Sequence, residues 1–225
     1  MSLIELKAVS KIYPLGNQQV VAVAELSLQI AAGEFTVLAG PSGSGKTTLL
    51  NLIGCLDRPS SGQVWLAGKE VGQAAAKQLA ALRLNQIGFI FQSYNLIPVL
   101  TAAENAEFTL MLQGVEKNAR RQRILQLFAE LGLQGLENRK PSDLSGGQQQ
   151  RVAIARAMAS QPTVILADEP TASLDTQASE ELLALMKTLN QQQRVTFVFS
   201  SHDPLVISHA RRVVRLRDGH LESDQ

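Results

Sequence analysis

Short, nearly continuous apolar runs alternate with helical patterns along most of the chain. The clearest apolar runs are Phe35 to Ala39, Ile87 to Phe91, Val164 to Ala167 and Val195 to Phe199. Strands buried on both faces have this pattern, and strands that alternate with helices usually form parallel sheets. The pattern therefore predicts an α/β fold in which helices cover a mainly parallel sheet.

The N-terminal third of the chain follows a different pattern. Polar and apolar residues alternate in Ile4 to Val9, Val20 to Ile30 and Gln63 to Leu66. Alternation is typical of antiparallel strands with one solvated face, so it predicts a smaller antiparallel β subdomain. At the C-terminus another alternating stretch surrounds Asp218-Gly219, which is typical of a two-residue hairpin turn.

Helical periodicity dominates residues 93–161. Thr101 and Glu104 form a capping-box pattern that opens a helix. A later helix carries an apolar face and ends at Gly132, a residue type common just beyond a helix. That face consists of Ile124, Leu127, Phe128 and Leu131. This region is predicted to be a helical subdomain inserted into the sheet domain.

Length and composition limit the possible functions. The 225 residues suit a single domain over 1–225, with a core formed by 1–92 and 162–225. A net charge of +1 argues against a nucleic-acid partner held by bulk charge. The one cysteine, Cys55, is expected to be a small buried hydrophobe. Since every apolar run is shorter than the ~18–20 residues of a membrane helix, a cytoplasmic protein is expected.

The strongest single motif is GPSGSGKT, between the strand that ends at Ala39 and a helical run. It matches G-x-x-x-x-G-K-[ST] in the strand–loop–helix context that this pattern requires. Glycines let consecutive N–H groups point at phosphate oxygens, and the helix N-terminus adds partial positive charge. Lys46 would reach the β- and γ-phosphates, and the Thr47 hydroxyl would bind Mg²⁺. The expected nucleotide-binding residues are Gly40, Pro41, Ser42, Gly43, Ser44, Gly45, Lys46, Thr47 and Thr48.

A second motif, VILADEP, places Asp168 and Glu169 directly after a predicted strand. Ligands of open parallel sheets bind beyond the carboxyl ends of the strands, so both acids should face the phosphates. We expect Asp168 to serve Mg²⁺, through water, and Glu169 to activate the attacking water.

A third motif, LSGGQ, contains Ser145, Gly146, Gly147 and Gln148 and opens another helical run. A Ser-Gly-Gly helix start is a second anion site. The chain thus offers two phosphate cradles but one set of metal and base residues. This excess indicates a composite site, in which the second cradle of one chain caps the nucleotide held by another.

With these three motifs in this order, the chain resembles the ATP-binding cassette (ABC) ATPase family over essentially its whole length. LSGGQ is the signature of that family, and the fold implied is a P-loop NTPase core with the two subdomains described above. The stretch SYNLIPVLTAAEN, Ser93 to Asn105, resembles the subgroup of lipoprotein-releasing and macrolide-exporting ATPases.

The resemblance implies further roles. Tyr13 occupies the place of an aromatic residue that stacks on adenine, although a tyrosine before proline could simply pack a turn. Gln92 fits the loop glutamine that senses Mg²⁺, and Asp175 fits the loop that crosses the dimer interface. His202 fits the switch histidine that contacts the γ-phosphate. The predicted catalytic residues are Glu169, His202, Lys46 and Gln92, and the predicted metal site consists of Thr47, Gln92 and Asp168.

The resemblance also implies a function. We expect an ATP-binding and ATP-hydrolysing subunit that forms a homodimer with Mg·ATP and drives a transmembrane permease. It would lie at the inner face of the cell membrane and power export or membrane extraction of cargo. The apolar run Leu96 to Leu100 could be core, but its place favours a groove for the partner.

Two alternatives remain at this stage. The subunit could signal through a membrane partner to cell-wall enzymes, which only the identity of the partner would reveal. It could also be a cytoplasmic motor on DNA or ribosomes, but such relatives carry coiled-coil insertions or a tandem cassette that we do not find in these 225 residues.

Overall fold

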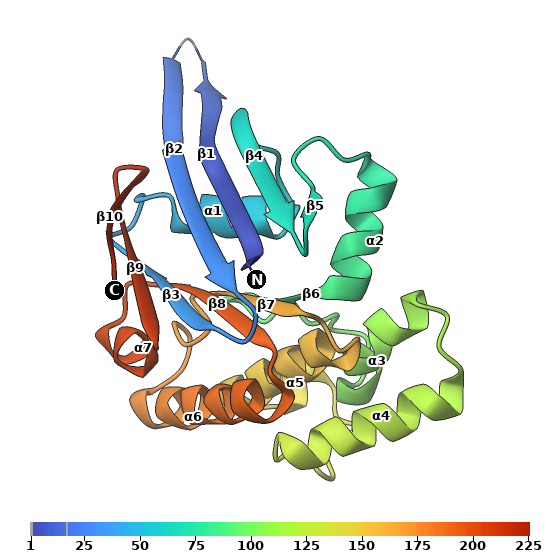
Figure 1. The fold of residues 1–225 in the computed structure, drawn as a ribbon. Helices are drawn as coiled ribbons and strands as arrows, with labels where there is room; N and C mark the ends of the chain where they lie inside the picture. Colours follow the sequence, from blue (N-terminus) through green and yellow to red (C-terminus); the bar gives the residue numbers. More distant parts are fainter. Residues whose placement is uncertain (1, 17) are drawn as a thin grey trace.

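A computed structural model describes residues 2–16 and 18–225. The strands are β1 (Ser2–Leu15), β2 (Gln18–Ala31), β3 (Phe35–Ala39), β4 (Ser61–Leu66), β5 (Lys69–Glu70), β6 (Ile87–Ile90), β7 (Val164–Asp168), β8 (Thr196–Ser201), β9 (Arg212–Arg217) and β10 (His220–Asp224) (Figure 1). The helices are α1 (Lys46–Ile53), α2 (Ala76–Gln86), α3 (Ala102–Leu112), α4 (Lys117–Glu130), α5 (Gly146–Ala159), α6 (Thr176–Gln193) and α7 (Pro204–His209), with a short 3₁₀ helix at Pro141–Asp143.

The central sheet has six strands in the order β10-β9-β3-β8-β7-β6. Its four inner pairings, from β9 to β6, are parallel, and β10 joins the edge through an antiparallel hairpin. This confirms the predicted α/β fold with a mainly parallel sheet. β8 continues two residues beyond the predicted end at Phe199, because Ser200 and Ser201 still pair with β3. β6 ends at Ile90, one residue before the predicted end.

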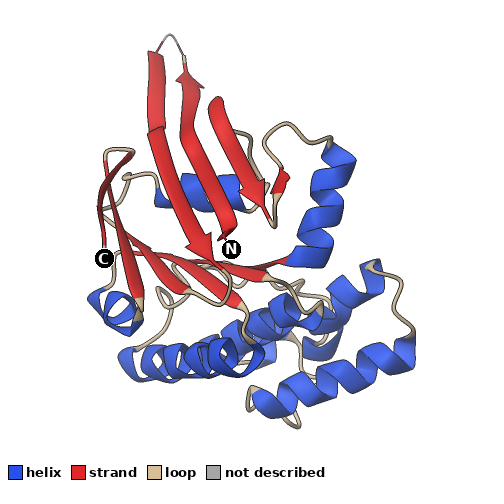
Figure 2. Ribbon diagram, in the orientation of Figure 1, coloured by secondary structure: helices blue, strands red, loops and turns tan. Residues whose placement is uncertain are grey.

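A second sheet of four strands, in the order β2-β1-β4-β5, is antiparallel throughout. It stands above the central sheet in Figure 2, with α1 between the two. The predicted antiparallel N-terminal subdomain is therefore confirmed. The C-terminal hairpin also turns at Asp218 and Gly219, both of which have positive φ values.

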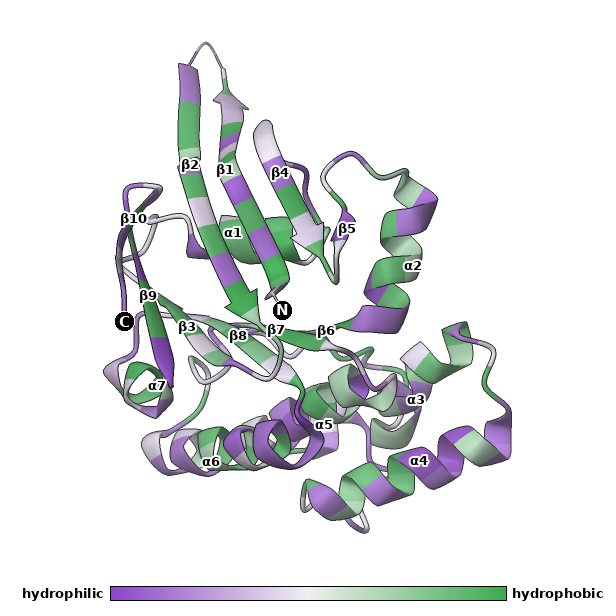
Figure 3. Cartoon of the chain, in the orientation of Figure 1, coloured by the Kyte–Doolittle hydropathy of each residue, from purple (hydrophilic) through white to green (hydrophobic). Residues whose placement is uncertain are grey.

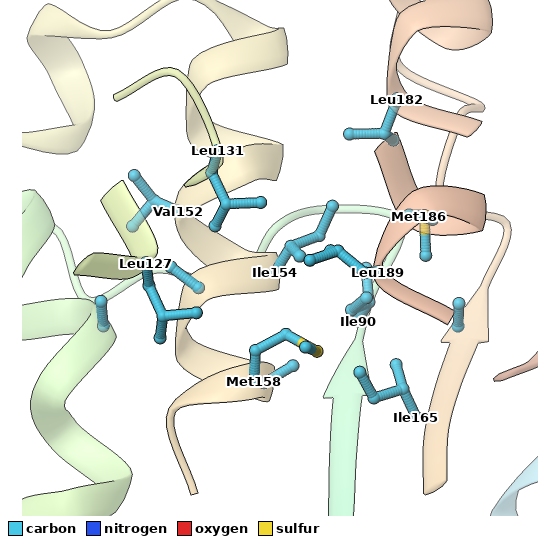
Figure 4. Close-up of a cluster of buried hydrophobic side chains, with 14 of the residues drawn as sticks. Ile90, Leu127, Leu131, Val152, Ile154, Met158, Ile165, Leu182, Met186 and Leu189 are labelled. Carbon is cyan, nitrogen blue, oxygen red and sulfur yellow. The ribbon is translucent and has the colours of Figure 1, made fainter. Parts of the chain in front are cut away.

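Two apolar cores lie on the two faces of the central sheet. The core towards the antiparallel sheet includes Ile4, Leu49 and Cys55, and burial raises the pKa of the Cys55 thiol to about 11. The other core joins the sheet to α3, α4, α5 and α6. Figure 4 shows residues of that core meeting at Ile154 and Met158 of α5. In Figure 3 the helices on this side carry hydrophilic as well as hydrophobic residues, as partly solvated amphipathic helices do.

The helical region forms as its caps predict. The Thr101 hydroxyl accepts from the Glu104 N–H at 3.2 Å, while Glu104 accepts from the Thr101 N–H. Gly132 follows α4 with a φ of 66°. Since α5 packs on β6 and shares a core with the sheet, the division into a core and a helical subdomain over 93–161 stays a prediction.

Candidate functional site

Four adjacent parallel strands, β3, β8, β7 and β6, end at the same edge of the sheet. The GPSGSGKT loop follows β3, His202 follows β8, Asp168 ends β7 with Glu169 directly after it, and Gln92 follows β6. These loops meet around one cavity of about 400 Å³, which we call the P-loop cavity. Its lining residues are Val20, Val21, Ala22, Ser42, Gly43, Gly45, Lys46, Thr47, Thr48, Gln92, Glu169, Ala172 and His202. The structure thus brings the predicted residues Lys46, Thr47, Gln92, Glu169 and His202 together at one cavity, with Asp168 outside its lining.

The P-loop, the GPSGSGKT segment from Gly40 to Thr47, is shaped by its glycines and by the start of helix α1. Gly45 caps the helix with a φ of 99° and offers no side chain to the first N–H groups, which are left to bind a ligand. The Lys46 ammonium donates to the carbonyl oxygens of Gly40, at 2.8 Å, and Pro41, at 2.9 Å. The loop therefore wraps around this cation, and phosphate oxygens entering the cavity would meet a positive charge and free N–H donors.

The antiparallel sheet packs directly against this loop. Lys11 pairs with Val23 and Ile12 pairs with Val21, so Ala22 is an extra residue that bulges from β2. A side chain at Gly45 would lie 2.3 Å from the Ala22 carbonyl oxygen. The bulge explains why residues of β2 line the P-loop cavity, a contribution that sequence alternation alone did not reveal.

Asp168 connects the loop to the central strands. Its carboxylate oxygen Oδ1 accepts from the Thr47 hydroxyl at 3.1 Å and also from the Ser200 hydroxyl. Thr47, Asp168 and the nearby Gln92 amide supply hard oxygen donors of the kind that Mg²⁺ prefers. Within 2–16 and 18–225, however, no group of three His, Cys, Asp or Glu side chains could hold a metal. These residues therefore fit Mg²⁺ that arrives with further oxygens from a phosphate.

Glu169 is held from both sides. Its Oε2 accepts from the Ser201 hydroxyl at 2.9 Å, and its Oε1 lies 2.7 Å from the His202 Nδ1. Only 16% of the Glu169 side chain is exposed, against 66% of the His202 side chain. Ser200 and Ser201 were missed by the sequence analysis, although polar residues at the end of a buried strand, next to an acid pair, were an available signal.

The signature motif forms a separate cradle at the N-terminus of α5. Ser145 caps the helix by accepting from the Gln148 N–H at 3.3 Å, and the Gln148 amide oxygen accepts from the Ser145 N–H at 3.0 Å. The surrounding cavity measures about 420 Å³, and we call it the signature cavity. It is lined by Gly132, Ser145, Gly146, Gly147, Gln148, Arg151, Ser173, Leu174, Asp175, Ala178 and Glu181. Within the described residues, the two cavities share no lining side chain.

Tyr13 lies beside the P-loop cavity rather than among its lining residues. Its hydroxyl donates to Asp57 at 2.7 Å, and its cross-strand partner Val20 does line the cavity. The predicted stacking of Tyr13 on adenine therefore stays a prediction.

Comparison with known proteins gives consistent results. The family profile described as ABC transporter matches residues 23–172. The macrolide export ATP-binding/permease protein MacB of Photorhabdus laumondii is 46% identical over 99% of this chain, which spans only 34% of that relative. An uncharacterized ABC transporter ATP-binding protein of Thermotoga maritima is 46% identical, over 97% of this chain and 93% of its own length.

Solved structures agree with the fold. A dimeric, post-hydrolysis ATP-binding cassette bound to ADP and Pi has a TM-score of 0.91 and 42% identity, over 99% of this chain and 97% of its own. A dimeric bacterial ABC transporter cassette has a TM-score of 0.92 at the same identity and coverage. The family profile covers more than half of the chain, and the relatives share close to half of its residues. Both observations confirm the resemblance that the three motifs indicated, and the chain belongs to the ABC transporter family as one of its ATPase cassettes.

Proposed function

We propose that this cassette binds Mg·ATP in the P-loop cavity, hydrolyses it between two copies of the chain, and drives a membrane permease. The observation that carries the proposal is the convergence of Lys46, Thr47, Gln92, Glu169 and His202 on one cavity at the carboxyl ends of four parallel strands. Scattered surface residues would not be expected to meet in this way.

The triphosphate is held mainly by the P-loop. The Lys46 ammonium exchanges carbonyl oxygens of its own loop for β- and γ-phosphate oxygens, and the N–H groups at the start of α1 bind others. Thr47, Asp168 and Gln92 would hold Mg²⁺ together with the phosphates. Bound Mg²⁺ neutralises the charge of the phosphates and of their leaving group.

Glu169 is the proposed general base. It accepts a proton from water as the water oxygen bonds to the γ-phosphorus and the bond to ADP breaks, which leaves ADP and phosphate. Ser201 and His202 fix the two carboxylate oxygens. We expect His202, on the exposed side, to contact the γ-phosphate. General-base catalysis is worth about 10²–10⁴-fold in rate.

A single chain has a second cradle that its own nucleotide does not use. We propose that two chains associate head to tail, so that the Ser145, Gly146 and Gly147 region of each faces the γ-phosphate held by the other. Asp175 lies in the signature cavity, beside the expected interface. ATP that contacts both chains stabilises the closed pair, and loss of the γ-phosphate releases it. The dimeric solved cassettes support this arrangement.

A third cavity is the proposed docking site for the permease. This groove, which we call the apolar groove, measures about 370 Å³ and lies between β6, α2 and the helices α3 and α5. Its main apolar residues are Leu56, Leu84, Phe89, Phe91 and Leu112. The predicted run Leu96 to Leu100 lies next to the groove rather than in it, because the groove is lined by Asn95 but by none of the five residues of the run.

The expected occupant of the apolar groove is a permease helix. The MacB relatives are ATP-binding/permease proteins of which this chain matches a third, so in them a cassette is joined to a permease. Among the described residues, no helix combines the length and hydropathy of a membrane span. A cassette docked in this way would lie at the inner face of the membrane and power export or extraction of cargo. Signalling to cell-wall enzymes finds no support among these relatives.

Hydrolysis can be tested with Glu169→Gln. This variant should hydrolyse Mg·ATP about 10²–10⁴-fold more slowly than the parent chain while binding ATP with similar affinity, as measured by phosphate release and calorimetry. Glu222→Gln, the same substitution in the C-terminal hairpin, is the matched control and should keep the parent rate. A Glu169→Gln variant that hydrolyses ATP at the parent rate would overturn the assignment of the base.

The partner can be tested by pull-down from detergent-solubilised membranes of the source cells. The tagged chain should retain a protein with transmembrane helices, and Leu112→Glu in the apolar groove should lose it. Leu125→Glu is the control, because Leu125 is also an exposed leucine but lies outside the groove. Equal retention by both variants would place the permease elsewhere.

A further inference from the structure

Three side chains form a compact cluster beside the P-loop cavity. The Tyr13 hydroxyl donates to Asp57 Oδ2 at 2.7 Å, and the Lys11 ammonium donates to Asp57 Oδ1 at 2.6 Å. The same ammonium lies over the Tyr13 ring, 4.8 Å from its centroid. Lys11 also donates to the Arg58 carbonyl at 2.8 Å. Every polar group of the cluster therefore has a partner within it or in the adjoining loop.

The cluster is more than a solvated surface pair. Only 13% of the Lys11 side chain and 29% of the Asp57 side chain are exposed. Burial alone would raise the pKa of Asp57, but hydrogen bonds from Lys11 and Tyr13 outweigh burial and hold this pKa below its usual value. Burial and the bond to Asp57 both raise the pKa of Tyr13, so its hydroxyl stays a donor.

Two parts of the site meet at this cluster. Lys11 and Tyr13 are two residues apart on β1 and lie on either side of the point where Ala22 bulges from β2. Asp57 follows α1, the helix whose N-terminus forms the phosphate cradle. The Asp57 bonds therefore set the Tyr13 ring relative to the cradle, while Val20, opposite Tyr13, reaches the cavity.

We propose that Lys11 and Asp57 act as positioning residues that fix the Tyr13 ring for stacking on the nucleotide base. The inference rests on the proposed function, in which a nucleoside triphosphate fills the P-loop cavity. Lys11 covers one face of the ring, and the proposal assigns the opposite face to the base. Asp57 holds the ring by its hydroxyl at a set distance from α1, so the base and the phosphates are bound in a fixed relation.

The test separates base binding from phosphate binding. Affinities for Mg·ATP and for magnesium tripolyphosphate, which has no base, are measured by calorimetry on the full chain and its variants. Tyr13→Ala should weaken ATP binding about tenfold, the effect of losing one base–aromatic contact, and leave tripolyphosphate binding unchanged. Asp57→Asn and Tyr13→Phe, which keeps the ring but not the hydroxyl, should each weaken ATP binding about threefold to fivefold with the same selectivity.

In steady-state kinetics the Asp57→Asn and Tyr13→Phe variants should show a raised KM for ATP and an unchanged kcat. Asp224→Asn is the matched control. Asp224 accepts two hydrogen bonds from Arg212, and neither residue lines the P-loop cavity. If Tyr13→Ala weakens ATP binding but Asp57→Asn does not, the positioning role of Asp57 is wrong, while Tyr13 remains the base-binding residue. Equal losses for ATP and tripolyphosphate would mean a structural role only. If Tyr13→Ala binds ATP with the parent affinity, both the base-binding role of Tyr13 and the positioning role of Lys11 and Asp57 are wrong. The proposal of hydrolysis by Glu169 would not be affected.

Discussion

The two phosphate cradles of this chain, GPSGSGKT and LSGGQ, bind anions by the same physical principle but are surrounded by different side chains. Each is a glycine-rich loop at the N-terminus of a helix, where free N–H groups and the helix dipole favour anions. The P-loop cavity adds a lysine, two acids, a glutamine and an imidazole around this device. The signature cavity adds a serine cap and the ion pair between Arg151 and Glu181, at 2.9 Å.

The glycines of the two cradles also serve different ends. Gly45 has a φ of 99° and no room for a side chain against the Ala22 carbonyl. Gly147 has an ordinary conformation, and its nearest neighbour, the Ala178 Cβ, would lie 3.9 Å from an added side chain. The first cradle is thus closed by its own chain at Gly45, whereas the second has open space at Gly147. The neighbouring glycines differ in the opposite sense, since a side chain at Gly43 would meet nothing within 4 Å and one at Gly146 would lie 2.8 Å from the Tyr94 hydroxyl. Open space beside Gly147 is compatible with a site shared between two chains.

The largest effect is expected from filling the second cradle. Ser145→Arg should leave the affinity of a single chain for ATP unchanged, because Ser145 does not line the P-loop cavity. Hydrolysis should fall by about 10²-fold or more, since transition-state stabilisation by oriented donors has this size. Phosphate release and calorimetry measure the two effects, and Ser145→Thr, which keeps the hydroxyl cap, is the control. A parallel loss of ATP affinity would contradict the separation of the cradles.

The converse substitution is Lys46→Ala. It removes the cation that the P-loop encloses and should weaken ATP binding itself, by about tenfold to a hundredfold for a charged hydrogen-bonding group. Calorimetry on the single chain measures the change, with Lys140→Ala on the exposed surface as control. Unchanged ATP affinity in Lys46→Ala would count against a phosphate role for this residue.

Three glycine substitutions compare how far each cradle depends on glycine for stability. Gly45→Ala should lower the free energy of unfolding by about 2–3 kcal/mol, because alanine is strained at positive φ and meets the Ala22 carbonyl. Gly43→Ala has a similar φ of 80° but open space, so it should be milder. Gly147→Ala should leave stability unchanged or slightly higher. Urea unfolding gives all three values, and similar losses at Gly45 and Gly147 would erase the contrast.

The smallest effect concerns pH. Because the pKa of folded Asp57 lies below its unfolded value of about 3.9, its contribution to stability is present above that pH and is lost as the pH falls further. The parent chain should therefore lose more stability than Asp57→Asn between pH 5 and pH 3, by under about 1 kcal/mol for a partly exposed group. Urea unfolding at both pH values checks the difference, and equal losses would show that the cluster does not titrate as described.

Much of this site could be predicted from the sequence because its parts are local. A buried strand followed by a glycine-rich loop or an acid pair specifies its own geometry, and parallel strands bring their carboxyl ends to one edge. Lys46 and Glu169 were predicted in this way, whereas the role of His202 came from the family resemblance. The signature cap likewise depends on only Ser145 and Gln148, three residues apart.

The rest depends on contacts between residues far apart in the chain. The bulge at Ala22 arises from the register of two long strands, which alternation of residue types does not specify. Tyr13 and Asp57 are separated by 44 positions and meet only after the antiparallel sheet has packed on α1. The apolar groove is formed by β6, α2, α3 and α5, which are separated in the sequence. The apolar run Leu96 to Leu100 could therefore be identified from the sequence, but the groove beside it could not.

The central claim is that the two cradles complete each other across two chains. Sedimentation velocity of Glu169→Gln with Mg·ATP tests it most directly, because this variant should bind ATP and keep it. The account predicts dimers with ATP and monomers without it, and monomers that still bind one ATP per chain when Ser145→Arg is added. Dimers that persist in the double variant, or a Glu169→Gln chain that binds ATP and stays monomeric, would contradict it.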